Sequence, residues 1–127
     1  MVPVRTIRSF LATLIFPMLA FLSANALASA PEIVKATMER GNAGWTFHVT
    51  LKHPDTGWDH YADGWRVVTK DGKVLGMRVL YHPHEEEQPF TRSLTKVMIP
   101  ANVSEVFIEA RCKKTGWGKQ RYRISLK

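Results

Sequence analysis

The sequence predicts an all-β fold, and three observations lead to that class. Apolar and polar side chains alternate with a period of two, most clearly in Trp45–His53. No segment shows a convincing helical period, and short alternating segments recur between turn residues at regular spacing. Together these features predict an immunoglobulin-like β-sandwich of about seven antiparallel strands. An open barrel with a similar number of strands is the competing fold.

The first 28 residues are expected to form a secretory signal peptide. Arg5 and Arg8 give a positive start, an apolar stretch follows, and small residues then alternate in an A-x-A rhythm. The apolar stretch is short for a membrane span, which needs about 20 apolar residues, and it contains Pro17. Cleavage is expected after Ala28, leaving one domain at 29–127; an uncleaved N-terminal anchor is the alternative.

Three strands are expected in the first half of the domain. The first is Ile33–Arg40, with Val34, Ala36 and Met38 on one face. After a glycine-rich turn, the second strand is Trp45–His53, where the residues on the apolar face are Trp45, Phe47, Val49 and Leu51. The polar loop Pro54–Asp59 leads to the third strand, at about Tyr61–Lys70.

Four more strands are expected in the second half. Asp71-Gly72 predicts a type I′ hairpin turn into Val74–Tyr81, because both central positions of that turn need a positive φ. The loop His82–Pro89 leads to a strand at Phe90–Ile99, and Pro100 turns the chain. The next strand, Glu105–Lys113, places Val106, Ile108, Ala110 and Cys112 on one face. After the turn Thr115–Gly118, the last strand alternates through Tyr122, Ile124 and Leu126.

The up-and-down course of these strands predicts which loops share an end of the sandwich. The loops Pro54–Asp59 and His82–Pro89, together with Cys112 and the turn Thr115–Gly118, all fall at one end. The Asp71-Gly72 turn falls at the other. Loops at one end of a rigid sandwich commonly carry binding, so we expect the functional residues at the first end.

Four histidines at this end are candidate metal ligands: His53, His60, His82 and His84. His53 and His60 could face each other across a tight loop, and His82 and His84 point the same way if the chain between them is extended. Imidazole nitrogen suits copper, zinc or nickel. The alternative is that these side chains form hydrogen bonds within the loops.

Further residues of the same end are possible members of the site: Asp55, Asp59, Trp58, Glu85, Arg92, Cys112 and Trp117. Asp55 and Asp59 more often cap loops than bind metals, and Glu85 begins a charge run typical of a solvated surface. Cys112 lies on an apolar face, which favours a buried thiol. Arg92 could pair with Glu85–Glu87 or with Asp55. The two tryptophans could form a binding wall or pack over the end of the sandwich.

Charge and cysteine content restrict the environment of the protein. After loss of Arg5 and Arg8, 16 of the 18 basic residues and all 11 acidic residues remain, a net charge of +5. This charge favours anionic surfaces but does not indicate nucleic acid. The single cysteine excludes an internal disulfide, so the domain depends on its core, a metal or a partner. We expect a periplasmic or secreted protein, with another envelope protein or a small ligand as its partner and no stable membrane span after cleavage.

Three motifs of the chain resemble superoxide reductase: His53-Pro54, His60-Tyr61 and Cys112-Lys-Lys-Thr-Gly-Trp117. That family is an immunoglobulin-like sandwich that holds iron with four histidines and one cysteine. The resemblance implies a non-haem iron redox protein in which Cys112, the first two histidines and one or both of His82 and His84 bind iron. The chain departs from the family at Thr115, where the family has a histidine. It is also similar to small secreted bacterial proteins.

Three functions are compatible with these patterns. The first is a non-catalytic periplasmic binding module that takes up copper, zinc or iron at its histidine-rich end. The second is an envelope interaction domain with no metal, and the third is the iron redox protein that the resemblance implies. The chain contains no glycine-rich phosphate loop, H-E-x-x-H motif or G-x-S-x-G motif. We therefore expect the binding module rather than an enzyme.

Overall fold

The computed structural model describes residues 2–4, 12–15, 17 and 30–127. The expected cleavage site after Ala28 lies outside the described residues, as does most of the expected signal peptide. In the described parts of the chain, no helix is long and apolar enough to cross a membrane.

Residues 30–127 form strands joined by turns and loops, with no helix in this range. The strands are β1 (Glu32–Gly41), β2 (Gly44–Lys52), β3 (Ala62–Val68), β4 (Val74–Val79), β5 (Phe90–Val97), β6 (Glu105–Cys112), β7 (Gly116–Trp117) and β8 (Tyr122–Ser125). The all-β prediction is confirmed, and each expected strand is present within a few residues of its predicted ends. The two-residue strand β7 is an addition, within the segment expected to be a turn.

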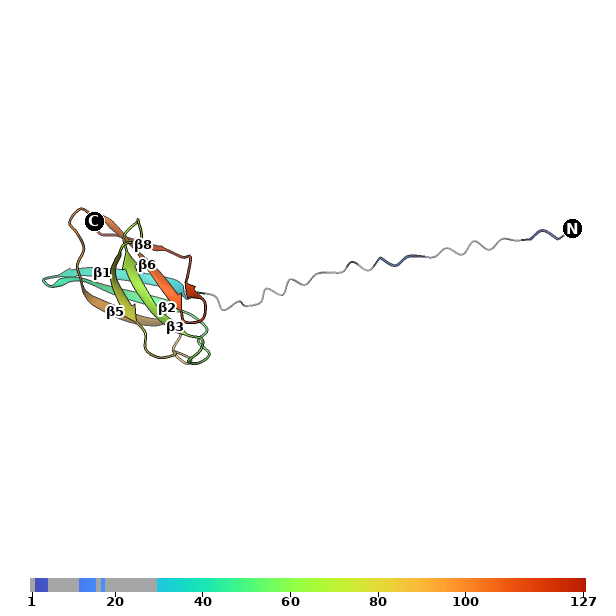
Figure 1. Ribbon diagram of the computed structural model, residues 1–127, viewed down its shortest axis with the longest axis horizontal. Coiled ribbons are helices and arrows are strands. Elements are labelled where there is room, and N and C mark those ends of the chain that lie inside the picture. The colour runs from blue at the N-terminus through green and yellow to red at the C-terminus, as the bar shows by residue number, and fades with distance from the viewer. Residues whose placement is uncertain (1, 5–11, 16, 18–29) are drawn as a thin grey trace.

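Two antiparallel sheets pack face to face (Figure 1). One sheet has three strands in the order β1-β2-β5; the other has five, in the order β4-β3-β6-β7, with β8 also paired to β6. The sheets meet through β4 and β5 on one side and through β1, β6 and β8 on the other. The domain is therefore a β-sandwich.

The core consists of the inward side chains of both sheets. From β2 these include Phe47, Val49 and Leu51, and from β6 Val106 and Ile108, all with no exposed surface. These are the faces that the alternation of apolar and polar residues predicted. Trp65 of β3 is the largest fully buried side chain and packs in the same cluster. Cys112 continues the inward row of β6 and is also fully buried.

Two local predictions were wrong. Val34 is 45% exposed, while Ile33 is 3% exposed, because the pairing of β1 with β2 shifts register between Ile33 and Lys35 and reverses the inward side of the strand. The Asp71-Gly72 turn is not type I′, because Gly72 has a positive φ of 89° and Asp71 does not. The N–H of Gly72 instead donates to the Thr69 carbonyl, which closes a four-residue turn at Thr69–Gly72.

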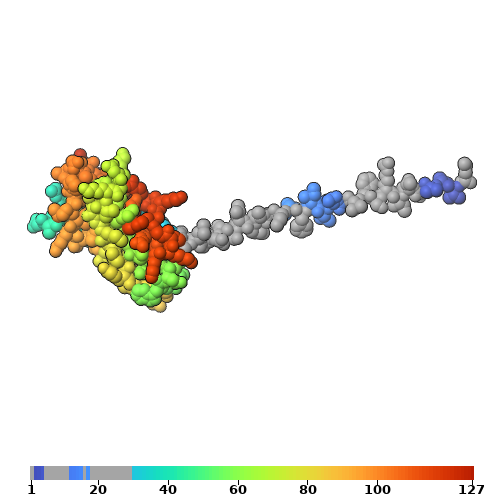
Figure 2. Space-filling model, in the orientation of Figure 1, coloured from blue at the N-terminus to red at the C-terminus, as the bar shows by residue number. Residues whose placement is uncertain are grey.

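The loops expected to share one end do so. The β2–β3 loop is bound to the β4–β5 loop through Asp55 and Gln88, and to the end of β6 through Lys113, whose N–H donates to the Tyr61 carbonyl. Figure 2 shows the green β2–β3 region beside the red β6–β8 region at this end of the molecule. The β1–β2 hairpin lies at the opposite end (Figure 1).

Candidate functional site

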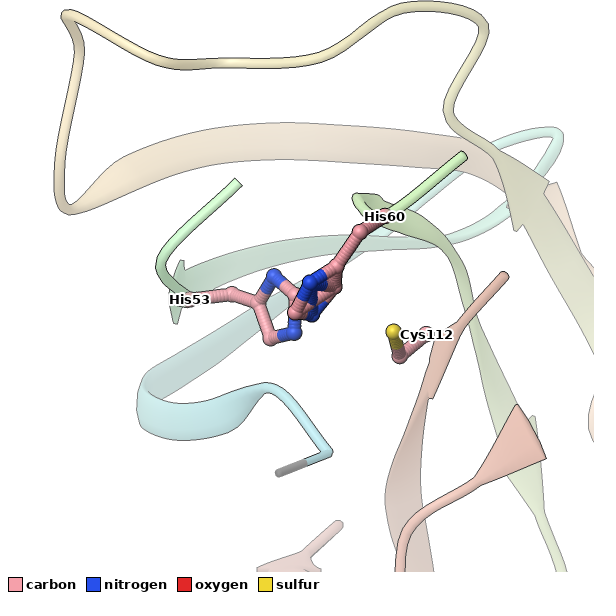
Figure 3. Close-up of side chains that lie close together, drawn as sticks. All are labelled: His53, His60 and Cys112. Carbon is pink, nitrogen blue, oxygen red and sulfur yellow. The ribbon is translucent and has the colours of Figure 1, made fainter. Parts of the chain in front are cut away.

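Three potential metal ligands converge where the two sheets meet at this end. His53 directly follows β2, His60 lies two residues before the start of β3, and Cys112 is the last residue of β6. One nitrogen of each imidazole and the Cys112 sulfur all lie within 4.8 Å of one another. Figure 3 shows the two rings and the sulfur turned toward the same space. We call these three residues the His/Cys cluster.

The β2–β3 loop folds so that its two histidines meet. The Asp55 N–H donates to the His53 carbonyl at 2.8 Å, the Thr56 N–H donates to the His60 carbonyl, and the His60 N–H donates to the Gly57 carbonyl. Gly57 has a φ of 148°, which a residue with a side chain rarely adopts. The two imidazoles contact each other edge to face, with ring centroids 4.9 Å apart. The two histidine side chains are therefore in contact across the loop.

Asp55 fixes the orientation of His53. Its side chain is fully buried, and Oδ1 accepts hydrogen bonds from His53 Nδ1 at 2.5 Å and from the Ala62 N–H at 2.9 Å. Oδ2 accepts the N–H of His84 at 2.8 Å. Because Nδ1 of His53 is the donor, its Nε2 carries the free lone pair. Asp55 thus accepts backbone N–H groups, as a loop cap does, and also orients His53, which is the candidate metal ligand.

One ring nitrogen of each histidine in the cluster has no hydrogen-bond partner in the described structure. Nε2 of His53 and Nε2 of His60 are both buried and unpaired within the described structure. Buried polar atoms are nearly always satisfied, so two unpaired imidazole nitrogens beside a buried thiol require an explanation. Imidazole nitrogen and cysteine sulfur are the donors that zinc, copper and iron take in proteins.

The other two histidines do not join this cluster. His84 is buried, stacks on Phe90 with ring centroids 3.9 Å apart, and accepts a hydrogen bond at Nε2 from Arg92 at 2.9 Å. His82 is exposed, with its ring 4.5 Å from that of His84. The four histidines share one end of the fold, as expected, but the structure separates them into two pairs linked through Asp55.

The remaining predicted residues surround this end. Arg92 pairs with Glu87 at 3.3 Å and contacts His84, so the alternative pairing with Asp55 is not formed. Asp59 and Glu85 are exposed. Trp58 is 64% exposed and contacts Tyr61, whereas Trp117 lies under the Arg66 guanidinium at 3.7 Å on β7. The tryptophans therefore take part in separate contacts.

Gln88 is a structural member of the site that the sequence interpretation missed. Its Oε1 accepts the N–H of His53 at 3.0 Å, and its Nε2 donates to the His84 carbonyl at 2.8 Å. It therefore joins the end of β2 to the β4–β5 loop. In the sequence, Gln88 is distinguished only by its position between the charge run Glu85–Glu87 and the start of a strand. This position does not indicate which backbone groups its side chain contacts.

Three side chains near the site have shifted pKa values. Burial lowers the pKa of His84, Arg92 and His82 lower it further, and Asp55 and Glu87 oppose them. The hydrogen bond from Arg92 lowers the pKa of Glu87, which is exposed. Burial raises the pKa of Asp63, against the charges of Arg111 and Lys113. The surroundings of His84 therefore favour its neutral form.

The lowered pKa of His84 predicts a loss of stability in mild acid. Below its ordinary value of 6.5 the unfolded chain binds a proton at this position before the folded chain does, so stability falls as the pH falls toward the folded pKa. We expect the melting temperature of the metal-free protein to fall more between about pH 7.5 and about pH 5.5 than that of His84→Gln. Equal pH dependence of the two proteins in thermal unfolding would contradict this.

Comparisons with known proteins give one relative and no structural match. No family model matches the chain, and no solved structure matches it. A protein of Halomicrobium mukohataei described as "Putative lipoprotein" is 39% identical over 89 residues, which are 69% of this chain and 43% of the relative. The chain thus spans less than half the length of that relative.

Proposed function

We propose that this protein is a secreted binding module of the cell envelope in which the His/Cys cluster holds one transition-metal ion. The observation that carries the proposal is the pair of buried, unpaired Nε2 atoms of His53 and His60 beside the buried Cys112 thiol. The envelope location is supported by the expected signal peptide and by the description of the relative as a lipoprotein.

The donor set fits a first-row transition metal. Zinc–nitrogen and zinc–sulfur bonds are about 2.1 Å and 2.3 Å, so two donors of one ion lie at most ~4.4 Å apart. The 4.8 Å bound on the cluster requires only a small inward movement of the side chains. Asp55 behind His53 is the carboxylate–histidine arrangement that commonly supports a metal ligand, since it fixes the tautomer and the ring orientation.

We also propose that the sandwich is of the immunoglobulin-like type. A three-stranded sheet β1-β2-β5 facing strands β4-β3-β6-β8 supports this assignment, because β2 pairs with both β1 and β5, and β3 pairs with β6. In such folds the loops at one end commonly carry binding, which agrees with the position of the cluster.

Metal analysis of the protein, purified without a histidine tag, tests the proposal. We expect one ion of copper, zinc or iron per chain in the wild type, and a loss of affinity of about 100-fold or more in Cys112→Ser or His60→Gln, because even an outer-shell change costs up to about 100-fold. Glu86→Gln in the exposed charge run is the control and should retain the ion. An ion retained equally by all variants, or no ion at all, would refute the proposal.

An iron redox protein of the superoxide reductase kind is less well supported. The resemblance implies four histidines and one cysteine around the ion, and the described residues gather two histidines and one cysteine. Nε2 of His84 already accepts a hydrogen bond from Arg92, and His82 is exposed.

An interaction domain without a metal is the second candidate. The observation that favours it is the edge strand β4, where Val74, Met77 and Val79 are each at least 39% exposed, followed by Tyr81 at 76%. Edge strands with exposed apolar side chains are sites where another chain can add. Under this alternative, Cys112→Ser leaves the function of the protein unchanged.

A further inference from the structure

The His/Cys cluster offers three donors, and their number restricts the metal. Among the described residues, the group comprises His53, His60 and Cys112, with no fourth histidine, cysteine, aspartate or glutamate joining them. Asp55 is adjacent, but its oxygens accept hydrogen bonds from His53, Ala62 and His84. Asp55 therefore supports His53 from behind and is not one of the three donors.

The cluster is also largely buried, with His60 as its half-buried member. Cys112 and His53 are at most 1% exposed, and the Nε2 atoms of both histidines are buried. Four surface cavities of about 160, 410, 450 and 470 Å³ are lined by other residues, and none of these four includes a member of the cluster. None of the four therefore opens onto the cluster to admit a substrate.

These two properties fit poorly with zinc. Structural zinc sites almost always have four protein ligands, and catalytic zinc sites have three together with an open position for water or substrate. The cluster has three donors and lies apart from the described cavities. A zinc ion here would lack the fourth protein ligand of a structural site, and none of these four cavities supplies the open position of a catalytic one.

The same properties fit copper. Thiolate sulfur favours Cu(I), imidazole accepts copper in either oxidation state, and two histidines with one cysteine form the trigonal donor set of protein copper centres. We propose that the ion in the His/Cys cluster is copper, bound as Cu(I) by His53 Nε2, His60 Nε2 and Cys112 Sγ in three-coordinate geometry. This inference rests on the proposed metal site. Binding displaces the thiol proton, and no oxidant or reductant is needed.

Competition between ions tests the identity of the metal. The metal-free protein is loaded anaerobically with Cu(I) against a coloured Cu(I) chelator, with Zn(II) added at about 100-fold excess over Cu(I). We expect one Cu(I) per chain, no displacement by Zn(II), and one sulfur with two nitrogens around copper in X-ray absorption. Affinity for Cu(I) should fall about 100-fold or more in Cys112→Ser and in His60→Gln, and stay unchanged in Glu86→Gln.

The outcomes separate the copper inference from the metal site itself. Displacement of Cu(I) by this excess of Zn(II), or a fourth protein donor in the absorption spectrum, would overturn the assignment to copper while leaving the metal site in place. Absence of binding by both ions would refute both. Thermal unfolding of the metal-free variants establishes that they are folded, and His60→Gln serves as the second variant if Cys112→Ser is unstable.

Discussion

Replacing Asp55 by asparagine is expected to weaken metal binding by about 10- to 100-fold, the usual effect of removing a carboxylate that supports a metal-binding histidine. Asp55 accepts three hydrogen bonds through two oxygens, from His53, Ala62 and His84. Asparagine keeps one oxygen and replaces the other by an NH₂ group. If the NH₂ group replaces Oδ1, both His53 and Ala62 face a donor in place of an acceptor, and if it replaces Oδ2, His84 does.

The two orientations of the asparagine have different consequences. If its NH₂ group faces His53, Nδ1 must become the acceptor, so the proton moves to Nε2 and this nitrogen can no longer bind a metal. If the NH₂ group faces the His84 N–H, the connection to the β4–β5 loop is lost. Either arrangement leaves a buried donor unpaired, at a cost of about 1–3 kcal/mol in stability.

Asp59→Asn is the matched control, because Asp59 lies in the same loop and is exposed. It should change neither metal affinity nor the free energy of unfolding by a measurable amount. Metal titration and denaturant unfolding, carried out on both variants, provide the two measurements. Equal metal affinities of Asp55→Asn and wild type would show that the orientation of His53 does not depend on this carboxyl group.

Truncation of Trp65 to alanine is expected to destabilise the domain by about 3–5 kcal/mol, as for other large aromatic side chains in protein cores. Trp65 is fully buried between the sheets and pairs in β3 with both neighbouring strands, at Arg78 of β4 and Ala110 of β6. A domain with one cysteine has no internal disulfide to compensate for the cavity.

Trp58→Ala provides the comparison for the same chemical change at the surface. Trp58 is 64% exposed, so its truncation should alter stability by no more than about 0.5 kcal/mol. Chemical denaturation of the metal-free proteins gives both values with the same reference state. Similar losses in the two variants would indicate that Trp65 is not the central residue of the core.

The sequence predicted the strands because side-chain alternation is a local property. In β2 and β6, every second residue is apolar, and those residues form the core. The same alternation placed Cys112 on the inner face. Strand order along the chain was enough to bring His53, His60 and Cys112 to one end, since successive antiparallel strands reverse direction.

The details of the site could not be predicted in the same way. The sequence offered four equivalent histidines, and the tertiary structure separated them, because Arg92 of β5 reaches His84 while the end of β6 meets His53 and His60. The inward position of Ile33, in place of Val34, depended on a register shift between paired strands.

The amino-acid sequence by itself determined the all-β class, the faces of the main strands and the end of the domain at which the histidines gather. The tertiary structure decided which of these histidines share space with the thiol, and that Asp55 orients one of them. The reason is physical: alternation is set by neighbouring residues, whereas a three-donor cluster needs side chains from three segments, placed only when the sheets pack.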